Sequence, residues 1–106
     1  MQDMAASAEK AARFLKLIAH PHRLLVLCTL LEGERNVTEL TKIVGISQTA
    51  MSNHLAKLRS ENVVDFTRDQ RTLTYRLSTA NAEPIIAALY KIYCSGEEVN
   101  TSVQTS

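Results

Sequence analysis

Residues 47–59 read SQTAMSNHLAKLR, and the rest of the chain is organised around this stretch. Four apolar residues recur in it at helical spacing, which predicts a helix with one side packed on a core. These residues are Ala50, Met51, Leu55 and Leu58. Ser47 suits the N-cap position, because its hydroxyl can accept a hydrogen bond from a free backbone N–H of the first turn.

The opposite side of this predicted helix carries hydroxyl and amide side chains rather than the Glu and Lys typical of a solvated face. Such groups suit hydrogen bonds to base edges and phosphate oxygens, so we expect the helix to read DNA. The expected contacts are Ser47, Gln48, Thr49, Ser52, Asn53, His54 and Lys57. Gln48 is the best candidate base reader, since its amide can bridge an adenine edge. For His54, packing is an equal alternative.

Charge is distributed unevenly along the 106 residues, although the formal net charge of +1 does not by itself indicate a nucleic-acid binder. Residues 42–76 carry six Lys and Arg against three Asp and Glu. A locally basic surface suits contact with phosphates. An ordinary solvated surface is the alternative interpretation of the same charges.

The length predicts one domain with an adequate but not large core. The apolar runs are too short to cross a bilayer and no signal peptide is present, so we expect a cytoplasmic protein without a membrane partner. The two cysteines, Cys28 and Cys94, would rest as thiols there, and a bond between them would be regulatory rather than structural. Paired carboxylates, a nucleophile triad and a phosphate-binding glycine loop are all missing from the sequence, so neither an enzyme nor a cofactor is expected.

Proline and glycine residues divide the first half of the chain into helices. The first is expected over 4–19, and His20-Pro21 ends it because the residue before a proline avoids helical geometry. The second runs to Glu32, where Gly33 stops it. The third covers 38–44, and Gly45 permits a sharp turn into the polar-faced helix. This order of short helix, glycine turn and polar helix predicts a helix-turn-helix.

Beyond that helix the apolar period changes to that of strands. Strands are expected over 63–68 and 72–77, joined by a turn at 69–71. Such a hairpin is marginal alone and must pack on the helices. It would form a wing with Arg68 and Arg71 near its tip, where arginine can enter the minor groove. A hairpin that only covers the core is the alternative.

The last helix is expected over 79–94, with an apolar surface broader than one contact needs. Together with the alanine-striped first helix it could build a dimer. Residues 95–106 are polar and rich in Ser and Thr, so they are expected to be a disordered tail after a domain at 1–94.

Three motifs in this order make the chain resemble the ArsR/SmtB family of bacterial repressors. They are LIAHPHRLLVL at 17–27, LTKIVGISQ at 40–48 and MSNHLAKLR at 51–59, and the resemblance covers about 10–94. It implies a mainly α fold with a β-hairpin wing, a winged helix-turn-helix. It also implies a homodimer, joined through the first and last helices, that represses a promoter on double-stranded operator DNA until an inducer binds.

Many members of this family sense metals, but two of the family's sites look absent here. One uses cysteines at the start of the third helix, where this chain has Val37, Thr38 and Leu40. The other uses Asp, His and Glu along the last helix, which here has no His. Soft metals need thiolate or imidazole ligands. We interpret His20 and His22 as capping and surface residues rather than a metal pair, so no metal is expected.

Taken singly, Cys28 fits a small core residue and Cys94 an incidental thiol at a helix end. Together they fall where the sulfur-responsive BigR/SqrR/HlyU subgroup places its sensing pair. The resemblance implies that persulfides join them through one or more sulfurs and release DNA, and thiol exchange makes this chemically plausible. Peroxide, disulfide stress or arsenite as the signal stays open. A winged-helix protein-interaction module with structural cysteines is a further alternative.

Overall fold

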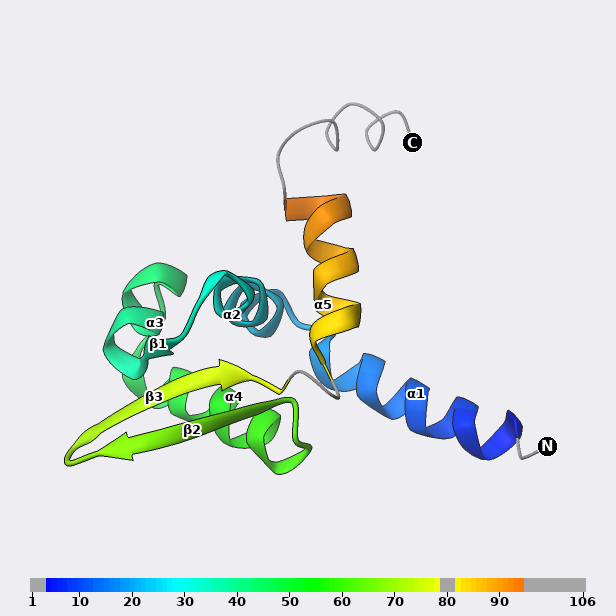
Figure 1. Ribbon diagram of the computed structural model, residues 1–106, viewed down its shortest axis with the longest axis horizontal. Helices are drawn as coiled ribbons and strands as arrows, with labels where there is room; N and C mark the ends of the chain where they lie inside the picture. The colour runs from blue at the N-terminus through cyan, green and yellow to red at the C-terminus, as the bar shows by residue number, and fades with distance from the viewer. Residues whose placement is uncertain (1–3, 79–81, 95–106) are drawn as a thin grey trace.

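The computed structural model describes residues 4–78 and 82–94 (Figure 1). Its elements follow the order α1 (Met4–Ile18), α2 (Pro21–Glu32), β1 (Arg35–Asn36), α3 (Val37–Val44), α4 (Gln48–Ser60), β2 (Val64–Asp69), β3 (Thr72–Leu77), α5 (Glu83–Leu89) and the π-helix η1 (Tyr90–Cys94). The mainly α fold with a β-hairpin wing, predicted from the sequence, is confirmed. The expected tail at 95–106 lies outside the described residues.

Local signals define where α2 and α3 begin and end. His20 is the N-cap of α2, and its Nδ1 accepts a hydrogen bond of 3.1 Å from the backbone N–H of His22. Asn36 and Glu39 form a reciprocal capping box at the start of α3, with bonds of 2.8 and 2.9 Å. Gly45 ends α3 in the left-handed conformation at φ 78°, which glycine adopts without a Cβ penalty.

The core lies where α2, α3, α4, the hairpin and α5 meet. Its largest fully buried side chains are Val26, Leu27, Leu40, Met51, Leu55, Leu58, Val63, Val64 and Ile86. Three of the four α4 residues expected to face inward are therefore buried, and the fourth, Ala50, is half-buried. This packing fixes which side of α4 faces outward.

The wing is one part of a three-stranded antiparallel sheet with the order β1-β3-β2. The expected hairpin is present, with Val64 opposite Leu77 and Asp69 opposite Thr72. Gln70 makes the turn at φ 61°. The sequence analysis did not predict β1, whose Arg35 pairs with Tyr75 of β3. A two-residue strand has no detectable period, and β1 attaches the wing directly to the start of α3.

The last helix differs from the uninterrupted α-helix predicted over 79–94. Positions 79–81 lie outside the described residues, α5 covers Glu83–Leu89, and the π-helix η1 follows from Tyr90 to Cys94. A π-helix closes its hydrogen bonds over five residues instead of four. Residues of η1 therefore lie in a different angular register from the one that a continuous α-helix would give them.

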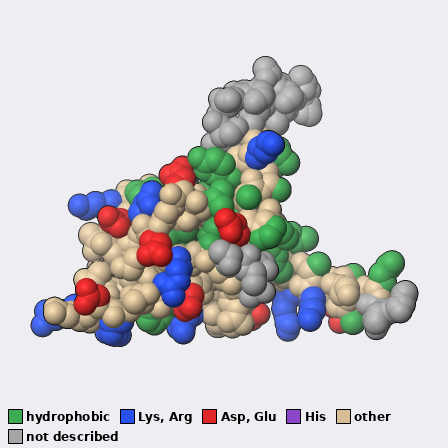
Figure 2. Space-filling view, in the orientation of Figure 1, with side chains coloured by type: hydrophobic (Ala, Val, Ile, Leu, Met, Phe, Trp, Pro, Cys, Tyr) green, Lys and Arg blue, Asp and Glu red, His purple; other side chains and the backbone are tan. Residues whose placement is uncertain are grey.

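The helix α1 and the column formed by α5 and η1 each present more than one apolar side chain to solvent. The helix α1 extends away from the body of the molecule (Figure 1), and Leu15 on it is 52% exposed. On α5 and η1 the residues Ile85, Ile92 and Tyr93 are exposed, and Figure 2 shows hydrophobic side chains gathered along this column. In the described part of the chain no single helix is long and apolar enough to span a bilayer, and α1 with α2, bent by 95°, passes that test only as a pair.

Candidate nucleic-acid interface

The outer face of α4 is the centre of the candidate interface. Ser47 caps the helix, with its Oγ accepting a hydrogen bond of 3.1 Å from the backbone N–H of Ala50. The expected DNA contacts on this face are all exposed: Gln48, Thr49, Ser52, Asn53 and Lys57. Because the buried residues hold the other side against the core, these polar groups are presented together on a fixed helix.

A polar groove joins this face to the wing. It has a volume of about 250 Å³ and is lined by residues from β1, α3, α4 and the wing, among them Gln48, Ser52 and Arg71. Arg71 is far from the other two along the sequence, so the hairpin is what places a guanidinium beside the recognition face. Arg68 is exposed on β2 but does not line the groove. The groove thus combines hydrogen-bonding groups with one positive charge.

Arg59 and Arg76, two of the basic residues of the 42–76 segment, make contacts within the wing or between the wing and α4. Asp65 lies 3.4 Å from Arg59 Nε and 3.6 Å from Arg76, so it joins the end of α4 to both strands of the hairpin. The Arg59 guanidinium also stacks 4.4 Å from the centre of the Phe66 ring. Each exposed ion pair is weak alone, but together these contacts orient the wing relative to α4. Sequence analysis missed them because they depend on tertiary packing.

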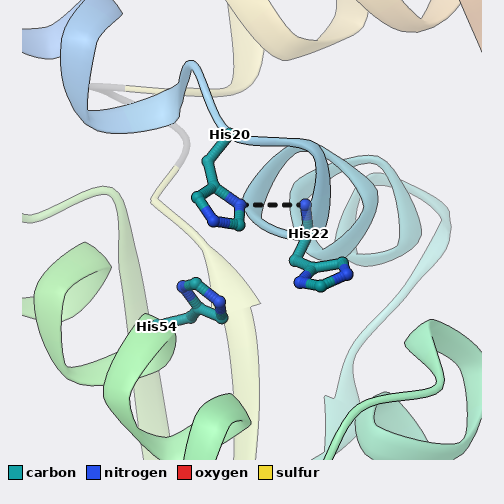
Figure 3. A group of neighbouring side chains, drawn as sticks. All are labelled: His20, His22 and His54. Atoms are coloured by element: carbon teal, nitrogen blue, oxygen red, sulfur yellow. Dashed lines mark hydrogen bonds between the residues drawn. The ribbon is translucent and has the colours of Figure 1, made fainter.

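His54 lies apart from the other expected DNA contacts. It is half-buried, and its Nδ1 accepts a hydrogen bond of 3.1 Å from Arg23 Nε. Figure 3 shows its ring facing His20 and His22 at the start of α2. This geometry favours the packing role that the sequence left open. Burial lowers the pKa of His54, and charges on His20, Arg23 and His22 lower it further, so its imidazole is neutral at pH 7.

The cysteine-bearing helices α2 and η1 are in contact. Cys28 is 6% exposed on the inner side of α2, as expected for a small core residue. Cys94 is the last residue of η1, and the position of its thiol lies outside what the structure describes. At the end of α2, Glu32 Oε2 accepts a hydrogen bond of 2.9 Å from the Tyr90 hydroxyl. The expected pairing of the two cysteines stays a prediction.

Similarity to known proteins agrees with this arrangement. The family model described as bacterial regulatory protein, arsR family, matches residues 20–65. The biofilm growth-associated repressor of Xylella fastidiosa is 40% identical over 97 residues, which cover 92% of this chain and 85% of the repressor. This chain belongs to the ArsR family. Its helix-turn-helix, formed by α3 and α4, lies inside the matched segment, and the wing and α5 extend beyond it.

Two further comparisons reach another ArsR-family relative. The transcriptional activator HlyU of Vibrio cholerae is 36% identical over 98 residues, covering 92% of this chain and 91% of HlyU. A structure of reduced HlyU from Vibrio cholerae superposes with a TM-score of 0.84 at 37% identity, over 90% of this chain and all of that one. The fold is thus shared along almost the whole chain, and the two relatives are named as a repressor and as a transcriptional activator.

Proposed function

We propose that this ArsR-family regulator is a dimeric repressor whose reduced form binds a palindromic operator and leaves it when Cys28 and Cys94 react with sulfur species. The observation that carries the DNA-binding part is the exposed polar face of α4 beside a groove that contains Arg71. Hydroxyl and amide groups there can contact base edges, while the guanidinium can contact a phosphate.

Dimer formation is supported by the apolar surfaces of α1 and α5. A hollow of about 590 Å³ along α1 is lined by Phe14 and Leu15 of α1 and Ile85 of α5, together with polar residues of α1 and Glu61. A monomer gains nothing from exposing such side chains, whereas a second copy would bury them. Two copies of α4 would then lie at a fixed separation, as half-sites about one DNA turn apart require.

The sulfur chemistry follows ordinary thiol exchange. A cysteine thiolate attacks the outer sulfur of a small persulfide, gains that sulfur as Cys–SSH and releases the small thiol. The second cysteine thiol then attacks the inner sulfur of this adduct, closing a disulfide and expelling hydrogen sulfide. If both cysteines carry an added sulfur, attack of one persulfide on the other closes a trisulfide and again expels hydrogen sulfide.

A bridge would connect the buried side of α2 to η1. Cys28 lies in the core on which α4 packs, whereas η1 continues the apolar surface proposed to form the dimer. The contact between Tyr90 and Glu32 supports the proposal that these helices are close enough to respond to each other. A shift of the dimer helix would alter the separation of the two α4 helices and so weaken operator binding.

The decisive experiment uses full-length reduced protein and a DNA duplex that this protein selects from a random library. The protein is treated separately with a persulfide, peroxide and arsenite, while fluorescence anisotropy reports DNA binding and intact mass reports modification. We expect the persulfide to release DNA with an intramolecular sulfur link, and Cys28→Ser and Cys94→Ser to abolish release. Release by peroxide or arsenite alone would identify the other signals.

The same experiment tests the non-DNA alternative. A winged-helix module for protein interaction predicts that no duplex is selected and that neither serine variant changes DNA binding. Selection of a palindromic duplex would exclude that alternative. Release by a metal without any covalent mass change, together with no release by the persulfide, would contradict the sulfur mechanism.

A further inference from the structure

All three histidines of the chain converge on one place. His20 lies between α1 and α2, His22 is in the first turn of α2, and His54 comes from α4 (Figure 3). The ring centres are 4.6 Å apart for His20 and His54, 5.4 Å for His20 and His22, and 5.9 Å for His22 and His54. One nitrogen of each ring lies within 4.8 Å of the others, and all three residues are half-buried.

We propose that this histidine cluster binds a divalent transition metal of the class of Zn²⁺, Co²⁺ and Ni²⁺. Neutral imidazole is a preferred ligand of these ions. Three nitrogens at metal–nitrogen distances of about 2.0–2.1 Å would leave a fourth, tetrahedral position for water. The ligand nitrogens must approach one another by about an ångström or more for this geometry. Small rotations of half-buried side chains can supply that movement.

The hydrogen bonds within the cluster show which ring nitrogens are unprotonated. Nδ1 of His20 accepts from the backbone N–H of His22, and Nδ1 of His54 accepts from Arg23 Nε, so each of these nitrogens is unprotonated and carries a lone pair that now accepts a hydrogen bond. The pKa of His54 is lowered, chiefly by burial, so at pH 7 a metal need not displace a proton from that ring. The positive charge of Arg23 disfavours a bound cation nearby. The guanidinium of Arg23 also donates a hydrogen bond of 2.8 Å to the Leu17 carbonyl, which holds it independently of His54.

A bound ion would compete with the existing contacts of the recognition helix. Coordination through Nδ1 would replace the bond from Arg23 to His54 or the cap bond at His20. Coordination through Nε2 would require the proton to move to Nδ1, which breaks the same bonds. In either case the ion joins α4 to the start of α2 in place of Arg23. The site therefore couples metal binding to the position of the helix that carries Gln48.

The cluster also changes how His20 and His22 are understood. The capping role expected of His20 is confirmed by its bond to the backbone N–H of His22. His22 is half-buried against the other two rings rather than on the surface. No metal was expected from the sequence because His20 and His22 alone make only a pair of ligands. Nothing in the sequence indicates that His54 packs on them.

The test uses full-length, chelator-treated protein in which Cys28→Ser and Cys94→Ser remove thiolate ligands. Co²⁺ is titrated while its visible absorption is recorded, and Zn²⁺ affinity follows from competition with a chromophoric chelator. We expect one ion per chain, and His22→Gln to weaken Zn²⁺ binding at least about tenfold, since loss even of an outer partner of a ligand costs 10–100-fold. His22→Gln keeps the backbone N–H that caps α2, and circular dichroism checks that the variant folds.

Glu9→Gln is the matched control, because it removes one exposed potential ligand on α1 and should leave Zn²⁺ affinity unchanged. Long-range ¹H–¹⁵N spectra of the imidazoles provide a second readout, in which one equivalent of Zn²⁺ should shift the signals of all three rings. Absence of saturable binding, equal affinity in His22→Gln, or unshifted rings would overturn the proposal. Metal binding is measured without DNA, so a negative result would leave the proposed operator binding untouched.

Discussion

Replacing Arg71 with alanine tests whether the wing contacts the DNA backbone. Arg71 is exposed next to the turn of the hairpin and lines the groove shared with Gln48 and Ser52. Its removal deletes one cation without taking any side chain out of the core. We therefore expect a loss of DNA affinity at low salt with little change in the free energy of unfolding.

The magnitude follows from counterion release. Each phosphate contact contributes about 0.9 to the slope of log affinity against log salt concentration, and a dimer loses two contacts, so the slope should become shallower by about 1.8. Between 50 and 200 mM salt this difference amounts to a factor of roughly ten. The Arg71→Ala defect should accordingly be about tenfold larger at 50 mM than at 200 mM salt.

The assay is fluorescence anisotropy with the selected duplex at several KCl concentrations between these limits. Lys16→Ala is the matched control, because it removes an equal charge from an exposed position on α1, away from the groove. Parallel salt slopes for Arg71→Ala and the parent protein would refute a phosphate contact by this residue. An equal change of slope in Lys16→Ala would show that overall charge, rather than the wing, is responsible.

The other predictions concern the reading helix and its support. Gln48→Ala should relax sequence preference in the selected-duplex assay, and a uniform loss of affinity on all duplexes would contradict base reading. Asn36→Ala removes the acceptor of the capping box and should cost about 1 kcal/mol, seen as a fall in Tm of roughly 4–8 °C, whereas Asn36→Asp should not. Gly45→Ala meets no atom within 4 Å but must adopt φ 78°, so it should cost about 1 kcal/mol in chemical denaturation. Gly45→Asn should cost less, and equal stability of the alanine variant and the parent protein would contradict this account.

Helix boundaries were predictable because their causes are local. The serine at 47, the glycines at 33 and 45 and the proline at 21 each act through neighbouring backbone, and α1 to α4 begin and end within about two residues of expectation. The inner side of α4 was equally accessible, since apolar spacing determines it. The exposed face expected to read DNA followed directly from that packing.

Features that depend on contacts between distant segments were not predictable in this way. The strand β1 has only two residues, so its pairing with β3 gives no periodic signal. The π-helix η1 has no distinguishing pattern of apolar residues. Pairing of Arg59 and Arg76 with Asp65, and of His54 with the start of α2, requires knowledge of how α4 packs.

Asn36 links the wing to the helix-turn-helix, because it is the strand residue of β1 that pairs with Thr74 and also the N-cap of α3. The base of the wing therefore cannot swing away from the helix-turn-helix without uncapping its first helix. We therefore expect the hairpin to bend at its free end, so that its tip can follow DNA grooves of different width. In the proposed dimer, we therefore expect differences in spacing between operator half-sites to be accommodated by movement of α1 and of the column of α5 and η1, rather than within the helix-turn-helix and wing.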